Sequence, residues 1–343
     1  MKNSLQQSLW AILLLAIPGF VQAQEQLRLE FRSVRPITDG LASETVGTSG
    51  PEMASGKLGN TDEGRDLEQL QDLTPWNFFS AGWDEESSKR QRPTGTPDLA
   101  LLRVQTNFME REVRVNYFYQ NNIHTKTREN LDNFDAFIAY AFNRRVMIEV
   151  LGNYQWVDPR GKLAEVDGGA PQFIGRVQLI DTESSSYTFN CRAIAPDRGI
   201  GDKQTTLSYG LAGFEDLAAY LDVNRVGLYY SFLFDTFAGP SAKGARQNDV
   251  GYDISIAKTL TRPDFPVLGT FTVFLEAFAQ TDLDGDNSGH TIVTMTPGVR
   301  FNLGKVAGVK LGLDNWIVAG VDVPVAGAKP WDATYRISYI KNF

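Results

Sequence analysis

Residues 113–120 read VRVNYFYQ, and apolar side chains at positions 113, 115, 117 and 119 alternate with mostly polar ones at the positions between. A period of two is the signature of a β-strand with two different faces, because successive side chains of a strand point to opposite sides. The same alternation recurs at 133–142, at 145–154 and in the closing stretch 331–339, WDATYRISY. The sequence therefore predicts an all-β fold.

The connections between such runs alternate in length. Short connections lie at 143–145, 182–185 and 303–307, and long ones rich in Gly, Asp, Asn or Pro lie at 121–132, 157–170, 195–203, 235–248 and 282–289. Transmembrane β-barrels combine short periplasmic turns with longer extracellular loops, and a closed barrel satisfies every strand hydrogen bond in lipid. We therefore expect a transmembrane antiparallel β-barrel. Further alternating runs lie at 173–179, 187–193, 207–213, 226–234, 250–256, 271–279, 293–301 and 309–313.

The number of strands depends on how the barrel begins. If Met109-Glu110 is a periplasmic turn, a downward strand precedes it, and residues 76–83 (WNFFSAGW) are the candidate for the upward strand before that one. This interpretation predicts about fourteen strands of membrane-spanning length. Twelve strands remain if the first strand or a weak one does not form.

Composition excludes several classes of protein. The chain has 343 residues with 33 Lys plus Arg against 41 Asp plus Glu, a net charge of −8 without any dense basic run, so nucleic acid is not an expected partner. A mean hydropathy of −0.24 is too polar for a bundle of membrane helices. The single cysteine, Cys191, rules out an intrachain disulfide and a cysteine-based zinc cluster. No cofactor is expected.

The N-terminus has the pattern of a secretory signal peptide. Lys2 precedes a short apolar run at 9–17 (LWAILLLAI), and the small residues around Ala23 suit cleavage after that residue. We interpret 1–23 as the signal peptide, 24–75 as a flexible or plug-like periplasmic segment and 76–343 as the barrel. The predicted location of the barrel is an outer membrane, with the lipid bilayer as the first partner.

A soluble β-sandwich is the alternative to a membrane barrel. Two features favour the barrel. Aromatic side chains such as Tyr154, Trp156 and Tyr187 lie near strand ends, as interfacial girdles do. In addition, charges of both signs occupy the polar faces in mid-strand, where a barrel would direct them into its lumen. The predicted lumen-lining residues are Arg103, Arg114, Asp135, Glu149, Arg176, Arg192, Arg225, Asp253, Glu276, Arg300 and Arg336.

The end of the chain resembles known outer-membrane proteins in two ways. Phe343, with Tyr339, Ile337 and Tyr335 on one alternating face, resembles the C-terminal signal that the outer-membrane assembly machinery binds, although Lys341 departs from it. The stretches 296–301 (TPGVRF) and 320–325 (GVDVPV) resemble the outer-membrane family labelled "MetA-pathway of phenol degradation". This resemblance covers the last third of the chain and implies a barrel in the outer membrane of a diderm bacterium and passage of small organic molecules. It carries no functional residue over to this sequence.

Three acidic residues form a weak candidate metal site. Asp282, Asp284 and Asp286 stand at every second position, as in a calcium loop. The EF-hand spacing fails, since Asn287 replaces the expected Gly and Val293 the bidentate Glu. A solvated loop is the simpler interpretation.

The histidines and the cysteine offer little for catalysis. His290, near Ser288, invites comparison with outer-membrane lipid hydrolases, but such chemistry needs a third group that orients the histidine. His290 and His124 are interpreted as polar loop residues, and Cys191 as a lipid-facing residue. Pro297 lacks a ladder donor, so we expect a local bulge there.

The leading functional hypothesis is an outer-membrane pore or transporter for small solutes, with the charged lumen setting selectivity. Mid-strand Phe118, Phe137, Tyr229, Phe274 and Trp316 point inward by the alternation, which favours amphipathic or aromatic solutes. The same side chains could instead fill the barrel. The alternatives are a non-transporting structural or surface-interaction barrel and an outer-membrane lipid hydrolase, although no enzyme activity is expected.

Overall fold

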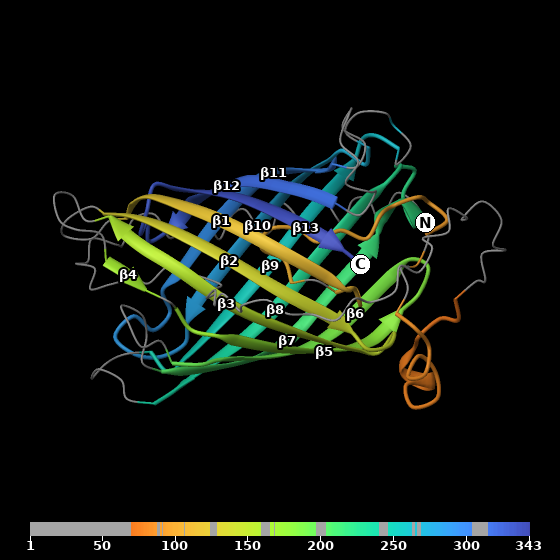
Figure 1. The fold of residues 1–343 in the computed structure, drawn as a ribbon, viewed down its shortest axis with the longest axis horizontal. Helices are drawn as coiled ribbons and strands as arrows, with labels where there is room; N and C mark the ends of the chain where they lie inside the picture. Colours follow the sequence, from red (N-terminus) through yellow and green to blue (C-terminus); the bar gives the residue numbers. More distant parts are fainter. Residues whose placement is uncertain are drawn as a thin grey trace, which may run out of the picture.

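A computed structural model describes residues 70–343, except 88–89, 91, 106, 124–128, 159–164, 168, 197–203, 240–245, 263–264, 266–268 and 304–314. The chain forms a closed antiparallel barrel of 12 strands (Figure 1). Each strand pairs with its neighbours in sequence, and the first strand also pairs with the last along ten residue pairs from Glu112↔Asn342 to Asn121↔Ala333. The predicted signal peptide 1–23 and most of the segment 24–75 lie outside the described residues.

The barrel strands are β1 (Glu112–Ile123), β2 (Glu129–Ala141), β3 (Val146–Asp158), β5 (Gln172–Asp181), β6 (Ser185–Ile194), β7 (Thr205–Asp216), β8 (Val226–Ala238), β9 (Asn248–Thr259), β10 (Thr272–Asp282), β11 (Thr291–Asn302), β12 (Asn315–Gly327) and β13 (Ala333–Asn342). The short β4 (Glu165–Asp167) pairs with β3 beyond the ring. Short 3-10 helices lie at Pro75–Asn77 (η2) and Leu217–Ala219 (η3). Among the described residues, no helix is long and apolar enough to cross a membrane.

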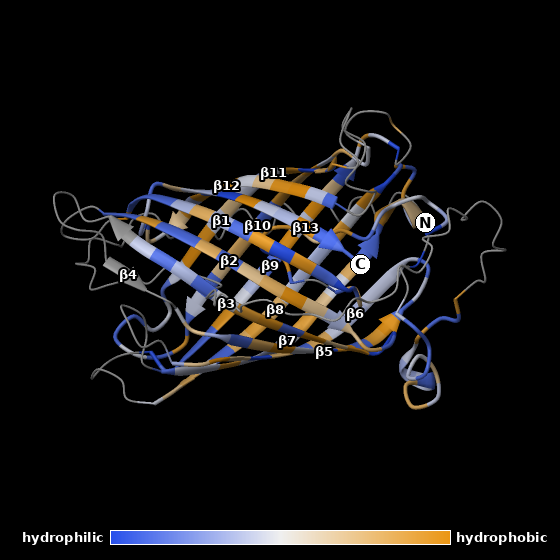
Figure 2. Cartoon of the chain, viewed as in Figure 1, coloured by the Kyte–Doolittle hydropathy of each residue, from blue (hydrophilic) through white to orange (hydrophobic). Residues whose placement is uncertain are grey.

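The two faces of the strands meet different surroundings. Outward apolar side chains are widely exposed, for example Ile138 at 56%, Leu211 at 50% and Ile254 at 52%. They form a hydrophobic band around the barrel (Figure 2). Inward side chains at alternating positions are buried, and many of them are polar. An apolar band of this extent on the outside, with polar groups inside, is the arrangement that lipid requires, and it confirms the barrel over the sandwich.

The two tightest turns indicate the orientation of the barrel. Residues 142–145 between β2 and β3, and 182–184 between β5 and β6, are tight turns at the end where β1 begins and β13 ends. Short turns mark the periplasmic end, so the beginning of β1 and the C-terminus face the periplasm. Three further connections at that end, 217–225, 260–271 and 303–314, are longer, whereas the sequence predicted a short connection at 303–307. The predicted run 309–313 lies outside the described residues.

The strand count is the lower of the two values that the sequence allowed. Residues 76–83 do not form the extra strand, because Pro75 opens η2 and the carbonyl of Asn77 then accepts the N–H of Ala81 in a further turn (3.0 Å). In the part of 70–108 that the structure describes, no strand precedes Met109 either. The described part of 98–109 is irregular and lies inside the barrel, and we call this segment the interior loop. The register shift between β11 and β12 falls at Val293/Thr294, before the expected position at Pro297.

The interior loop fills the inner half of the lumen. Its Leu99, Leu101, Val104 and Phe108 are each at most 6% exposed, because they pack against inward side chains of the wall. A ring of this size is too wide for strand side chains alone to fill, so a segment from before the first strand completes the core. The wall residues in this cluster are Phe214, Tyr229, Ala257, Phe274, Val318 and Ile340.

Candidate functional site: the barrel interior

The charged residues predicted to line the lumen fall into two groups. Most lie on the buried faces of barrel strands: Arg114, Asp135, Glu149, Arg176, Arg192, Asp253, Glu276, Arg300 and Arg336. Arg103 and Arg225 were wrongly placed in mid-strand. Arg103 belongs to the interior loop. Arg225 lies in the turn before β8, which begins one residue later, and has a φ of 54°.

Asp322 of β12 holds the tip of the interior loop. Its Oδ2 atom lies 2.6 Å from Nη2 of Arg103 and 2.5 Å from Nε of Arg336. Its Oδ1 atom accepts the hydroxyl of Thr296 at 2.7 Å. The carboxylate is fully buried, and two guanidinium groups compensate its charge. Sequence reasoning missed Asp322, although its place between Val321 and Val323 shows the same alternation that identified the other charges.

Glu276 of β10 binds the loop through its backbone. One carboxylate oxygen accepts the N–H groups of Arg103 and Val104, each at 3.1 Å. Glu276 is 0% exposed, and the two N–H groups belong to irregular chain that has no strand partner. The carboxylate therefore satisfies donors that would otherwise be buried without a partner.

A second set of ion pairs lies on the opposite wall. Arg176 of β5 binds Glu149 of β3 with two bonds, Nε to Oε1 at 2.8 Å and Nη2 to Oε2 at 3.0 Å. The same Nη2 also reaches Oε1 of Gln105 in the interior loop at 3.4 Å. Towards the outer end, Arg192 of β6 pairs with Asp235 of β8 at 3.3 Å. Such bidentate pairs fix side-chain geometry as well as charge.

The inward aromatic side chains serve two purposes. Tyr229 and Phe274 pack in the apolar core around the loop. Phe118, Phe137 and Trp316 instead lie beneath guanidinium groups. The distances from Cζ to the ring centre are 4.3 Å for Arg336 over Phe118, 5.6 Å for Arg114 over Phe137 and 4.2 Å for Arg300 over Trp316. The interior thus alternates arginine with aromatic ring, an arrangement stabilised by cation–π attraction.

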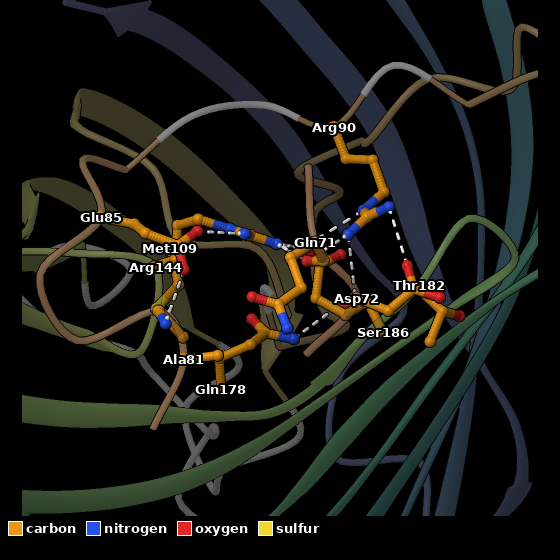
Figure 3. Close-up of polar contacts among 12 residues, drawn as sticks. Gln71, Asp72, Ala81, Glu85, Arg90, Met109, Arg144, Gln178, Thr182 and Ser186 are labelled. Carbon is orange, nitrogen blue, oxygen red and sulfur yellow. Dashed lines mark hydrogen bonds and ion pairs between the residues drawn. The ribbon is translucent and has the colours of Figure 1, made fainter. Parts of the chain in front are cut away.

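A cluster of charged residues fixes residues 71–87 and Arg90 to the periplasmic rim (Figure 3). Arg144 binds Glu85 at 2.5 Å and Asp181 at 3.1 Å. Arg90 binds Asp72 at 3.0 Å and Asp181 at 3.4 Å. Burial raises the pKa of Glu85, but the hydrogen bonds from Arg144 and from a backbone N–H outweigh it, so the pKa is lowered overall. This cluster fixes the position from which the interior loop enters the lumen.

Three pockets adjoin the interior loop. Two of them share Arg103, Gln105 and Arg192, one of about 70 Å³ beside the β1–β6 wall and one of about 40 Å³ towards the outer ends of β8–β10. The third, of about 20 Å³, lies on the periplasmic side against Phe108 and Met109 of the loop. The loop therefore separates an outer chamber from an inner one.

The weaker candidate sites have structural explanations. Asp284 accepts the backbone N–H groups of Gln247 and Asn248 at 2.5 and 3.1 Å, and Asp282 pairs with Arg246 at 2.8 Å, so these carboxylates connect neighbouring outer loops. Within the described ranges no group of three or more potential metal ligands occurs.

The serine and histidine of the hydrolase hypothesis do not form a pair. The Ser288 hydroxyl donates to the carbonyl of Leu283 at 3.0 Å, and it makes no hydrogen bond with His290 among the described contacts. Cys191 is exposed on the outer face, as its alternation predicted. His124 lies outside the described residues.

The fold is similar to that of solved outer-membrane proteins. The COG4313 outer membrane channel from Pseudomonas putida F1 aligns with a TM-score of 0.52 and 8% identity, covering 71% of this chain and 100% of that one. The NanC porin aligns with a TM-score of 0.47 and 8% identity over 67% of this chain and 99% of that one. No family model matches the chain, and no curated protein matches its sequence. The resemblance to the "MetA-pathway of phenol degradation" family therefore stays a prediction. The protein is an outer-membrane β-barrel that shares its fold with a channel protein.

Proposed function

We propose that the protein is an outer-membrane channel for small solutes, in which the interior loop forms the barrier between the outer and inner chambers. The observation that carries the proposal is the separation of the pockets. Cavities with polar side chains in their lining lie on both sides of the described part of 98–109. A shift of the loop would join these cavities into a path through the barrel.

Polar contacts hold the tip of the barrier. Asp322, Glu276 and Arg176 of the wall bind Arg103, Val104 and Gln105 at the tip of the loop. Such contacts exchange more readily with water than an apolar core does, since each released group can be hydrated. We infer that solutes cross when this tip shifts and connects the chambers.

The lining also suggests a class of solute. Phe118 and Phe137 line the pocket beside the β1–β6 wall, and Phe278 lines the outer one, each together with arginine side chains. A solute with an apolar face and a polar or anionic edge fits such a surface better than a simple inorganic ion does. Small amphipathic or aromatic solutes are therefore the proposed substrates.

Liposome swelling and planar-bilayer conductance test the proposal. The variant Asp322→Ala, which releases Arg103 at the tip of the loop, should increase solute flux several-fold while the barrel stays folded. Asp286→Ala in an exposed outer loop is the matched control and should leave flux unchanged. If neither the wild type nor Asp322→Ala passes sugars or small aromatic acids, the protein is a non-transporting barrel. The filled inner half of the lumen is the structural observation that favours this alternative.

A further inference from the structure

Residues 75–83, which we call the aromatic turn, present large apolar side chains outside the barrel. Trp76 is 97% exposed and Phe79 is 92% exposed, and Trp83 adds a partly exposed ring at 39%. Two fully exposed large aromatic side chains within four residues are unusual on a surface that faces only water. The aromatic turn therefore requires a partner that the chain itself does not provide within its described part.

The aromatic turn is held in place by hydrogen bonds. Arg145, which is 0% exposed, donates to the carbonyl of Ala81 at 2.9 Å and to that of Asn77 at 3.2 Å. Its guanidinium also lies over the ring of Phe78 at 5.0 Å. These contacts fix the backbone beneath Trp76 and Phe79. The two rings are thus exposed on a backbone that is held in one position.

The position of the aromatic turn identifies the partner. The side chain of Asn143 donates to the carbonyl of Trp83 at 2.8 Å, and Asn143 directly follows Phe142. Phe142 and Tyr140 are 55% and 42% exposed at the periplasmic end of β2, where they belong to the lipid-facing wall. Figure 1 shows this segment (orange) beside the strand ends at the periplasmic end. The aromatic turn therefore continues the lipid-facing surface at the level where the bilayer ends.

We infer that the aromatic turn inserts Trp76 and Phe79 into the headgroup region of the periplasmic leaflet. Aromatic side chains are enriched at the membrane–water interface, where apolar rings and polar backbone groups are both satisfied. Anchoring the aromatic turn in lipid also holds the neighbouring charged cluster of Arg90 and Arg144, and with it the entry of the interior loop. The inference does not depend on the proposed transport function.

Lipid-borne and water-borne quenchers test the inference on the full-length mature protein in phosphatidylcholine–phosphatidylglycerol vesicles. In a Cys191→Ser background, Phe79→Cys carries a fluorescent label, and Asp286→Cys at the opposite end is the matched control. A headgroup-nitroxide lipid should quench the label at position 79 several-fold more strongly than the label at 286. Iodide, present on both sides of the membrane, should show the reverse order. Equal behaviour of the two labels overturns the inference.

Intrinsic fluorescence supplies a second measurement that needs no cysteine. The difference between the emission of the wild type and that of Trp76→Phe isolates Trp76. In vesicles this difference spectrum should be blue-shifted and quenched by shallow brominated lipids. A red-shifted spectrum that iodide quenches refutes insertion. Protection from both quenchers also refutes it, since it assigns the aromatic turn to a protein partner or a second copy of the chain.

Discussion

At the scale of single residues, consecutive residues of a strand face different environments, one the polar interior of the barrel and the next the lipid. Glu149 is 3% exposed and binds Arg176 in the interior, whereas Val150 is 48% exposed on the outer face. The alternation of a strand thus decides which residue tolerates charge. A carboxylate at position 149 is compensated by a guanidinium, but a charge at position 150 would enter hydrocarbon.

Val150→Arg should therefore reduce the yield of folded protein. An arginine on the lipid face near the bilayer midplane costs about 2–4 kcal/mol. The measurement is refolding into liposomes, followed by gel mobility of unheated samples. Val150→Leu is the matched control and should refold as the wild type does. Equal yields of the arginine and leucine variants would contradict the lipid-facing assignment.

Asp284 should make the contact between two outer loops sensitive to acid. Donation by the backbone N–H of Gln247, followed by the groups of Asn248, keeps the pKa of Asp284 below its ordinary value of 3.8. A lowered folded-state pKa means that the contact contributes stability above pH 3.8 and loses it as the pH falls through the folded-state pKa.

Hydrogen exchange of the Gln247 and Asn248 amides measures this loss. Their protection should fall in the acid range in the wild type, and the step should disappear in Asp284→Asn, which cannot ionise. Asp286→Asn should retain the step, since Asp286 lies on the exposed side of the same loop. If Asp284→Asn still loses amide protection at acid pH, a group other than Asp284 causes the loss.

At the scale of elements, the interior loop depends on groups from several strands. The apex at Arg103 and Val104 has no strand partner, and Glu276 supplies the acceptor for both N–H groups. Apolar contacts are not directional, so the apolar residues around the apex would be compatible with many backbone conformations. The hydrogen bonds to the Glu276 carboxylate require one of these conformations.

Glu276→Ala should free the two N–H groups. A hydrogen bond to a charged group contributes about 1.5–3 kcal/mol, so the exchange of the Arg103 and Val104 amides should accelerate by roughly 10- to 100-fold. Glu276→Gln keeps a carbonyl acceptor and should show a smaller effect. Exchange that does not change in Glu276→Ala would mean that packing alone holds the apex.

Sequence reasoning predicted the barrel strands well but misjudged the segment before them. Strands such as Glu112–Ile123 have one face in lipid and one in the polar lumen, so their alternation is strong. The interior loop also mixes apolar side chains with Arg103, because it meets both an apolar cluster and charged wall residues. Local pattern cannot distinguish these two cases. Residues 76–83 were wrongly predicted as a candidate for an additional strand, because η2 depends on a cap between Thr74 and Asn77.

At the scale of the whole molecule, closure depends on the pairing of β1 with β13. The ladder runs to Asn342, and the N–H of Phe343 donates to the carbonyl of Arg111 at 3.1 Å just beyond it. The Phe343 side chain is 63% exposed and adds little to the packing. Its resemblance to the terminal signal therefore leads us to predict a role in recognition by the assembly machinery and not in packing.

Deletion of Phe343 should separate assembly from stability. In cells the variant should reach the outer membrane much less than a variant that lacks residues 24–69. After refolding in detergent, however, its unfolding midpoint should match that of the wild type, because the ladder is intact. Membrane yield by fractionation and midpoint by denaturant titration are the two measurements. A large loss of midpoint would assign a structural role to Phe343.

The interior loop has a further consequence for the topology of folding. Residues 92 and 111 on either side of it both lie at the periplasmic end, where Arg92 binds the carbonyls of Thr182 and Glu183 at 3.0 and 2.9 Å. The interior loop thus enters and leaves the barrel at the same, periplasmic end, so no chain end has to pass through the barrel. Insertion can follow closure of the strands, and withdrawal leaves every strand pair unbroken. The barrel wall can therefore close first, and the interior loop can enter or leave afterwards without forming a knot.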